Sequence, residues 1–423
     1  MSATIHQRVT RLATLTAVHR AFYWLHLHQP QIRRWLLDTV SIPAPPFGEQ
    51  ERATAFLDRF RELGLTNVHL DEEGNALAEL APDGEPMEEH SPVVLLSAHL
   101  DTVFPAGTLC DPVEDEESSR IYGPGVCDNA AGLSALLALA AALRFARINP
   151  PATILFAANV GEEGEGDLRG MRYLFTRGSY RGRIAAAIAL EGSGTSTVVT
   201  KGLGSLRYRV TINGPGGHSW SDAGAPNPIL LLSRALASIA EIPLSRSPLT
   251  TLNVGHISGG TSVNSIPASA TALIELRSTY AAHMHEAAHE IRRILHETVA
   301  PVIGPASLTI DIIGDRPAAV LPEGSALLST LRAVDRHLRL HTEQRIGSTD
   351  ANLPLSLGIP ALAIGTGGNG GSIHTLDEWY DPAGRETALR RILLLLLAAT
   401  QIATELGEEA SSAARTAAVH STP

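Results

Sequence analysis

The sequence predicts an α/β protein, with a mostly parallel, helix-covered sheet in a main domain and a smaller α+β domain inserted into it. The first observation is a set of apolar runs, PVVLLSA, ATILFAAN, IAAAIAL and ALAIG, each leading into a loop or turn with ionisable residues. Such runs, separated by helical stretches such as residues 132–146, are typical of strands covered on both faces. The second observation is a change of pattern between residues 203 and 316. The third is length, because 423 residues exceed the size of one growing hydrophobic core.

The first sixty residues or so are predicted to be helical and to flank the main sheet. Their large apolar residues recur near helical spacing on both sides of the break SIPAPPFG. They are Trp24, Leu25, Ile32, Leu36, Leu37, Phe56, Leu57 and Phe60. We therefore expect helices before and after this proline-rich break.

Residues 203–316 are predicted to form the inserted domain. The order of elements is strand (SLRYRVTI), helix (NPILLLSRALASIA), strand (TTLNVGHIS), strand (ATALIELRS), helix (HEAAHEIRRILHETV) and strand (SLTIDII). This β-α-β-β-α-β order is that of a ferredoxin-like unit. Gly202, Gly204 and Gly314 lie at its limits as candidate hinges. The main domain would then consist of residues 1–202 and 317–423.

Composition argues against several classes of partner. The net charge is -11, from 33 basic and 44 acidic residues, which disfavours nucleic acid and anionic lipid. The two cysteines, Cys110 and Cys127, allow no disulfide framework and suit a reducing cytoplasm. No signal peptide is expected. The most apolar runs, residues 133–143 and 392–400, are too short to span a bilayer and suit buried helices.

Ionisable residues gather where the predicted strands end, which is where sites form in such sheets. HLDTV places His99 and Asp101 two residues apart, so that both side chains share a face. An imidazole can bind a metal while a carboxylate fixes its tautomer. Taken alone, this pair is weak evidence, because such a pair more often belongs to a surface loop.

Acidic residues elsewhere offer further metal ligands. Asp128, in GPGVCDNAAG, could bridge two cations or cap the helix that follows. Of Glu162 and Glu163, in GEEGEG, one could bind a cation and the other a bound water. Adjacent carboxylates repel each other, and a nearby cation would allow both to stay ionised. Their alternative is an exposed acidic turn. Asp350 could cap a helix or support a metal ligand.

Glu191, in ALEGSG, and His374, in GGSIHTLDEWY, complete a candidate ligand set. Two histidines and three carboxylates suit two zinc ions. The hypothesis rests on the joint occurrence of five candidate ligands, because each of them alone could have a purely structural role. The set is His99, Asp128, Glu163, Glu191 and His374.

These motifs resemble those of the cocatalytic zinc exopeptidases, the group of peptidase T, aminoacylase, bacterial glutamate carboxypeptidase and succinyl-diaminopimelate desuccinylase. HLD, the aspartate of GVCDN, GEEG, LEG, GPGGHS, GGTSVNSIP, ELR and HTLDE occur in that family's order. The resemblance covers most of the chain, and its last part, from STDANLPLS to HTLDEWY, looks most like the tripeptidase-like branch. GPG and Asn129-Ala130 replace an arginine turn and a lysine of many relatives, which puts substrate preference in doubt.

The resemblance implies a role for each residue of the main domain's site. His99 and Glu191 would hold one metal, Glu163 and His374 the other, and Asp128 would bridge them. Asp101 would orient His99, and Glu162 would be the general base. The cofactors would be two divalent ions, with zinc favoured and cobalt or manganese able to substitute.

The resemblance also gives the inserted domain a role as a lid and dimerisation domain. His218 would polarise the scissile carbonyl in the partner's site of a homodimer. Asn264 and Arg277 would receive the polar groups and the carboxylate of the substrate.

The expected function is that of a cytoplasmic metallopeptidase that hydrolyses amide bonds in short peptides, as a di-/tripeptidase or aminopeptidase. An N-acyl-amino-acid amidohydrolase or a carboxypeptidase is the alternative, because both would use the same metals and Arg277. A non-catalytic binding protein on the same scaffold is a remote alternative, and the intact Glu162 argues against it. A serine hydrolase is disfavoured, since the sequence has no GxSxG elbow.

Overall fold

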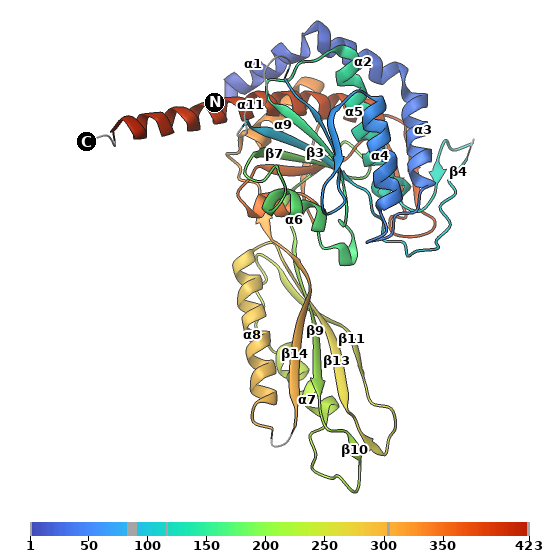
Figure 1. Ribbon diagram of the computed structural model, residues 1–423, viewed down its shortest axis with the longest axis vertical. Helices are drawn as coiled ribbons and strands as arrows, with labels where there is room; N and C mark the ends of the chain where they lie inside the picture. Colours follow the sequence, from blue (N-terminus) through green and yellow to red (C-terminus); the bar gives the residue numbers. More distant parts are fainter. Residues whose placement is uncertain (1, 83–90, 116, 303–304, 421–423) are drawn as a thin grey trace. The chain divides into compact units, whose positions relative to one another are not determined.

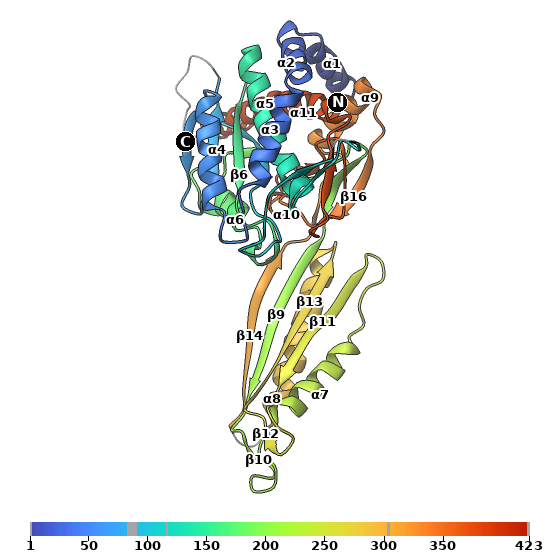
Figure 2. The ribbon, with the colours of Figure 1, turned by 90° about the vertical axis from the view of Figure 1, so that its right-hand side faces the viewer.

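The computed structural model describes residues 2–82, 91–115, 117–302 and 305–420, with side chains for residues 4–405 of these ranges. The chain forms two compact units, Met1–Thr200 with Leu321–Pro423, and Lys201–Val320. The sequence-based boundaries, 203 and 316, fall within a few residues of these limits. Figures 1 and 2 show the mixed sheet and helices of the first unit and the long strands of the second.

The first unit is built on a nine-stranded sheet whose central strands are parallel. Strand β6 pairs with β3, β3 with β7, and β7 with β17, all in parallel. Every residue of β3 and β6 is buried, which explains why both read as continuous apolar runs. The order is β1 (Thr66–Leu70), β2 (Ala76–Leu80), β6 (Thr153–Asn159), β3 (Val93–His99), β7 (Ile184–Leu190), β17 (Ala361–Ile364), β8 (Thr197–Gly202) and β15 (Ala319–Val320), with β16 (Glu343–Gly347) paired to β8. The predicted α/β fold class is confirmed.

Helices surround this sheet, as the apolar periodicity predicts. Four of them precede the first strand and are interrupted by the proline-rich break: α1 (Ser2–Ala13), α2 (Thr16–Leu27), α3 (Gln29–Val40) and α4 (Gln50–Glu62). The others are α5 (Gly132–Ala146), α6 (Arg169–Thr176), α9 (Ala326–Leu338), α10 (Asn352–Ser356) and α11 (Arg385–His420). Helices α5 and α11 contact β3, and α4 contacts β1 and β2.

Two helical stretches have the length and composition of a membrane span, Val126–Ala146 and Arg385–Glu405. Both are longer than the apolar runs that the sequence singles out. Within the first unit, 94% and 72% of their most apolar windows are buried. Core helices of folded domains share these properties, and α5 and α11 occupy such positions here.

A small sheet lies beside the main one and joins distant parts of the chain. Its order is β18 (Asn369–Gly371), β19 (Trp379–Asp381), β5 (Ile121–Tyr122) and β4 (Val113–Glu114). Trp379 pairs with Tyr122, and Tyr380 with Ile121. The segment after His374 is therefore attached to the segment before Asp128.

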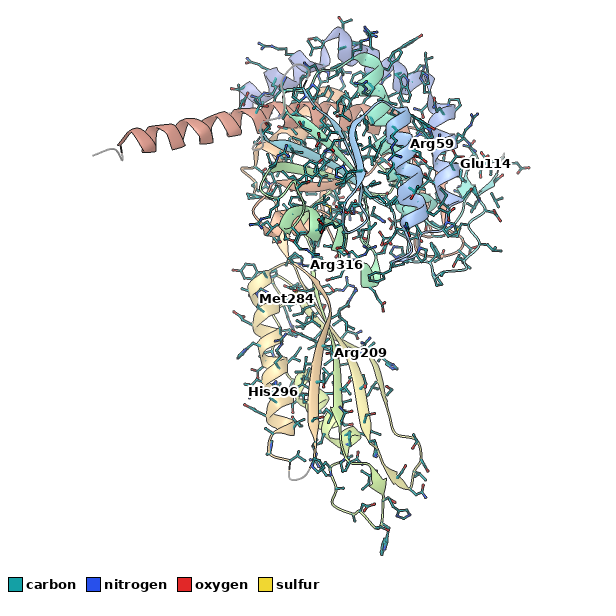
Figure 3. All side chains as sticks on the ribbon, viewed as in Figure 1. Arg59, Glu114, Arg209, Met284, His296 and Arg316 are labelled. Atoms are coloured by element: carbon teal, nitrogen blue, oxygen red, sulfur yellow. The ribbon has the colours of Figure 1, made fainter. Side chains whose placement is uncertain are left out.

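The second unit has the predicted β-α-β-β-α-β order. Its strands are β9 (Gly204–Asn213), β11 (Thr250–Gly259), β13 (Ser269–Ser278) and β14 (Ser307–Arg316), and its helices are α7 (Pro228–Ala240) and α8 (Ala281–Val299). The antiparallel order β11-β13-β9-β14 is ferredoxin-like. Alternate residues of β13 are buried, and Met284 of α8 packs into the same core. Figure 3 labels Met284 and, on the same helix, the exposed His296.

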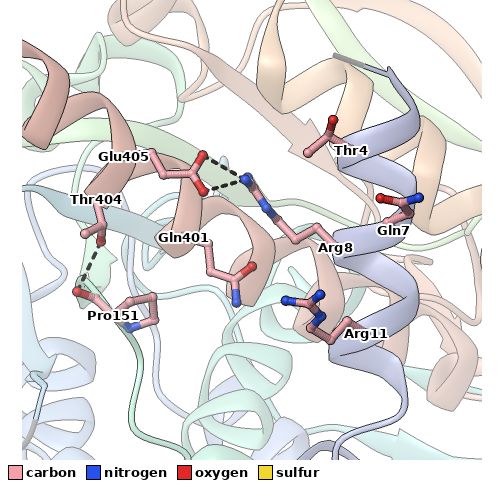
Figure 4. Close-up of a pocket in the computed structure, with 8 residues that line it drawn as sticks. All are labelled: Thr4, Gln7, Arg8, Arg11, Pro151, Gln401, Thr404 and Glu405. Atoms are coloured by element: carbon pink, nitrogen blue, oxygen red, sulfur yellow. Dashed lines mark hydrogen bonds and ion pairs between the residues drawn. The ribbon is translucent and has the colours of Figure 1, made fainter.

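The N-terminal and C-terminal helices of the first unit meet around a surface cavity of about 430 Å³. Two hydrogen bonds of 2.5 and 2.7 Å join Arg8 of α1 to Glu405 of α11 (Figure 4). Both side chains reach solvent. A second ion pair of α11 is buried: Arg391, 0% exposed, binds both carboxylate oxygens of Asp335 on α9 at 2.6 and 3.0 Å.

We expect the buried pair to contribute far more to stability than the exposed one. Asp335→Ala would leave the Arg391 charge buried without its carboxylate, which costs about 3 to 5 kcal/mol of unfolding free energy. Arg8→Ala should cost about 1 kcal/mol or less, because its pair is hydrated. Urea unfolding of both variants measures the difference. Equal losses would contradict this ranking.

Candidate metal centre

The predicted ligands gather at one edge of the main sheet. His99 is the last residue of β3, Glu162 and Glu163 follow the end of β6, and Glu191 directly follows β7. Because these strands are parallel, their carboxyl ends share an edge. The fold thus brings together residues that are up to 92 positions apart in this part of the chain, counted from 99 to 191.

Asp128 lies between the two histidines. Its Oδ1 is 3.0 Å from Nε2 of His99, and its Oδ2 is 3.2 Å from Nε2 of His374. The same Nε2 of His374 is 3.1 Å from Oε1 of Glu163. Ligand atoms of His99, Asp128 and Glu163 all lie within 4.8 Å of one another. One carboxylate is therefore placed to bridge two positions.

Ahead of α5, the residue whose side chain binds the backbone is the neighbour of Asp128, Asn129. Asn129 Oδ1 accepts the N–H of Gly132, the first residue of α5, at 3.1 Å. Asn129 also donates to the carbonyl of Leu190 at 2.9 Å and accepts the N–H of Gly192 at 3.3 Å. It thereby joins the Asp128 turn to the two residues that flank Glu191. In the sequence, Asn129 stands out only because Asn129-Ala130 differs from the pattern of many relatives.

The carboxylates of this cluster repel one another. Loss of hydration, together with the charge of Asp128, raises the pKa of Glu191 to about 8. Burial alone would raise the pKa of Asp128, but His374 and His99 outweigh it and hold the pKa well below its usual range. A site with this many acidic groups favours positive charge.

The two imidazoles respond in the opposite direction. Burial alone would lower the pKa of His99, but Asp101, Asp128 and the charge of Glu162 raise it well above its usual range. Hydrogen bonds to Asp128 and Glu163 raise the pKa of His374 to about 10. The acidic groups around both rings thus favour the positively charged form of each imidazole.

Asp101 organises the turn that carries Glu162 and Glu163. Its Oδ1 accepts the N–H of Glu162 at 2.9 Å, and its Oδ2 accepts the N–H of Glu163 at 2.7 Å. His99 Nδ1 lies 3.0 Å from the backbone oxygen of Asp101 and 3.7 Å from its Oδ1. Asp101 therefore contacts His99 through its backbone, while its carboxylate holds the acidic turn.

Two buried residues support this arrangement from behind. Arg52 of α4, 1% exposed, donates to the carbonyl of Leu100 at 2.6 Å, between His99 and Asp101. Sequence reasoning missed Arg52, because an arginine in an amphipathic helix normally faces solvent. Asp350 accepts the Nδ2–H of Asn159 at 2.8 Å, and its charge raises the pKa of Glu191. Ala351 precedes α10 without a side-chain cap, and the role of Asp350, as a cap or as support for a ligand, stays a prediction.

In the second unit, His218 and Asn264 lie together. His218 belongs to β10 (Gly217–His218), which pairs with β12 (Ser265–Ile266), and Ser219 N–H donates to the carbonyl of Asn264 at 3.0 Å. Nδ1 of His218 accepts the N–H of Trp220 at 3.2 Å. The neutral ring therefore carries its proton on Nε2, and the exposed residue presents a donor.

Arg277 lies at the far end of β13 from this pair. It is eight positions after Ser269, where β13 begins, which corresponds to about 26 Å of extended strand. Arg277 donates to both carboxylate oxygens of Glu275, at 2.9 and 3.0 Å. The predicted substrate-binding residues of this unit thus form two separate places, and the guanidinium already has an acidic partner.

The donor set fits divalent cations. It offers imidazole nitrogens from His99 and His374 and carboxylate oxygens from Asp128, Glu163 and Glu191. Zinc and similar first-row ions take this mixture of nitrogen and oxygen ligands. A cation would also offset the charge that otherwise favours protons on both rings.

Known proteins share this fold. A tripeptidase of Staphylococcus aureus superposes with a TM-score of 0.69 at 21% identity, covering 88% of this chain and 98% of that one. A dinuclear metal-binding peptidase of Bacillus subtilis gives a TM-score of 0.65 at 16% identity, with 88% and 98% covered.

Sequence comparison identifies the family. A probable carboxypeptidase of Talaromyces marneffei is 28% identical over 218 residues, which is 46% of this chain and 48% of that protein. The chain therefore spans about half of the length of this curated relative. The model of peptidase family M20/M25/M40 matches residues 95–399, well over half of the chain. The chain belongs to this family.

Proposed function

We propose that this chain is a metallopeptidase that hydrolyses the amide bond of short peptides, as a di-/tripeptidase or aminopeptidase of the tripeptidase-like branch, with two zinc ions. One observation carries the proposal: the two oxygens of Asp128 face Nε2 of His99 and Nε2 of His374. A carboxylate shared in this way suits two cations. The fold shared with a tripeptidase supports the choice of short peptides.

The ligands divide naturally into two sets around Asp128. His99 and Glu191 would hold one ion, and Glu163 and His374 the other. Bound there, the two ions would act as Lewis acids that polarise the scissile carbonyl and make water a better nucleophile.

Glu162 is the proposed general base. Its backbone N–H is held by Asp101, and its carboxylate is near enough to His99 for its charge to affect that ring. The side chain is buried, 3% exposed, which would shield it from bulk solvent. Glu162 would accept a proton from the attacking water and deliver it to the leaving amine.

The second unit would complete the site in a homodimer. Its β11 is an edge strand among the described strands, with residues 253–259 exposed, which suits pairing with a second copy. His218 would donate its Nε2–H to the carbonyl oxygen in the partner subunit's site. The separation of His218 and Asn264 from Arg277 supports two subunits serving one substrate.

A carboxypeptidase is the second candidate, because curated relatives carry that name. An N-acyl-amino-acid amidohydrolase would share its requirement for a free carboxylate. Arg277 would bind that carboxylate, although Glu275 competes for the same guanidinium. Dipeptides, tripeptides, N-acyl amino acids and their C-terminally amidated analogues distinguish these activities. Amidation should abolish cleavage by a carboxypeptidase and leave aminopeptidase cleavage largely intact.

We expect bound zinc to stabilise the protein. Zinc at a hundred times its Kd should add about 2.7 kcal/mol per site, since it binds the folded cluster and relieves repulsion among the carboxylates. Calorimetric Tm values before and after chelation measure this effect, and metal analysis gives the stoichiometry. Asp128→Asn should lose most of the shift. A Tm that does not respond to chelation and reloading would contradict the metal centre.

Glu162→Gln should lower kcat on the cleaved peptide by about two to four orders of magnitude, because it removes the base and retains the shape. Metal content should stay unchanged. Glu165→Gln is the matched control, since Glu165 lies in the same turn but is exposed. Near-normal turnover of Glu162→Gln would remove the proposed role.

Mixing two nearly inactive variants tests the homodimer. If His218 acts in the partner's site, a dimer of one His218→Ala subunit and one Glu162→Gln subunit has one intact site. Random exchange makes half of the dimers mixed, so about a quarter of wild-type activity should return. No recovery, with exchange verified by differently tagged subunits, would place His218 in its own subunit's site.

A further inference from the structure

A buried glutamate holds the turn that carries Asp128. Glu378 is 0% exposed, and its Oε1 accepts the N–H groups of Cys127 and Asp128, each at 2.8 Å. Its Oε2 accepts the N–H of Gly125 at 3.3 Å. Three backbone donors therefore converge on one carboxylate, and Asp128 is itself one of them.

The turn depends on this acceptor because of its own shape. Gly125 has a φ of 72°, and a Cβ there would lie 2.5 Å from Cγ2 of Thr102 and 3.1 Å from the carbonyl oxygen of Asp128. The tight path turns successive N–H groups to one side, away from solvent. Without the carboxylate, these buried donors would have no equivalent partner, which is costly.

Glu378 also belongs to the segment that supplies His374. Its N–H donates to the carbonyl of Thr375 at 3.1 Å, and its own carbonyl accepts the N–H of Gly123 at 3.0 Å. The pairing of β19 with β5 continues the same attachment. The chain after His374 and the turn before Asp128 are therefore joined by both the side chain and the backbone of Glu378.

This attachment sets the position of Asp128 relative to both histidines. The contacts of Asp128 with His99 and His374 are 3.0 and 3.2 Å long, so a shift of about 1 Å would remove at least one of them. A rotation of the peptide group of Asp128 would break the bond between its N–H and Glu378. The carboxylate is thereby kept with one oxygen toward each ring.

We propose that Glu378 is a positioning residue that fixes Asp128 as the shared ligand and so determines how tightly the two metal positions bind. The inference rests on the proposed metal centre. Glu378 does not contact substrate or reacting atoms in this scheme; it acts through Asp128. Partners of this kind typically contribute a factor of about 10 to 100 in metal affinity.

Glu378→Gln is the informative variant. An amide oxygen can replace Oε1 and keep the bonds to Cys127 and Asp128, while the amide NH2 would face the N–H of Gly125. The fold should therefore survive, with a turn that is less firmly held. Glu378→Ala removes all three acceptors and should show a larger effect where it folds.

Glu79→Gln provides a matched control. Glu79 is a buried carboxylate of the same unit, 6% exposed, and its Oε1 accepts from Asn67 at 3.0 Å and from Tyr180 at 2.5 Å. It lies on β2 and contacts none of the proposed ligands among the printed hydrogen bonds of the described residues. It should lose stability without losing metal affinity.

The test is calorimetric titration of each metal-free full-length protein with zinc, with cobalt absorption spectra as a second readout. Wild type should bind two ions, and Glu79→Gln should bind them with the same affinities as wild type. Glu378→Gln should bind at least one ion about 10 to 100 times more weakly than wild type, and its cobalt spectrum should differ. Unchanged affinities and spectrum in Glu378→Gln, beside a two-ion wild type, would overturn this inference alone. A wild type that does not bind two ions would overturn the proposed metal centre as well.

Discussion

The contact of one carboxylate with two imidazoles is the constraint on which the rest of this site depends. Asp128 has only two oxygens, and each is occupied by a different ring. His99 comes from a central strand, whereas His374 follows the last strand of the main sheet. These three residues keep their relative positions only if the Asp128 turn is held from several sides. Asn129 attaches it to the end of β7, and Glu378 attaches it to the segment of His374.

The same cluster carries more negative charge than a protein interior normally tolerates. Buried carboxylates are costly unless they are paired with positive charge or hydrogen-bonded. Asp101 meets this requirement through two backbone N–H groups, and Asp128 through the two histidines. For Glu191, burial and the charge of Asp128 outweigh the charge of His99, and the pKa of its carboxyl rises to about 8. Cations in the cluster would remove this conflict, which gives the donor set a physical reason to bind metal beyond the matching of ligand types.

The inserted unit carries its predicted substrate-binding residues at two separate places. Its core is closed by α7 and α8 on one face, which leaves the edge strand β11 and the β10–β12 ribbon exposed. The ribbon carries His218 with a defined donor nitrogen, while Arg277 lies at the opposite end of β13 with Glu275. Long antiparallel strands suit this arrangement, because each residue of a strand adds about 3.4 Å to the distance between the residues at its two ends.

The amino-acid sequence by itself determined the element types, the α/β class and the chemical types of the candidate ligands. Apolar runs such as PVVLLSA are local features, since a strand buried on both faces must be apolar throughout. The order of HLD, GEEG, LEG and HTLDE is likewise visible along the chain. Only the tertiary structure decided which neighbours hold these ligands. Glu378 reaches a backbone N–H 250 positions away, and Arg52 a carbonyl 48 positions away. Backbone groups are the same in every residue, so a side chain that binds them leaves no mark at its partner's position in the sequence.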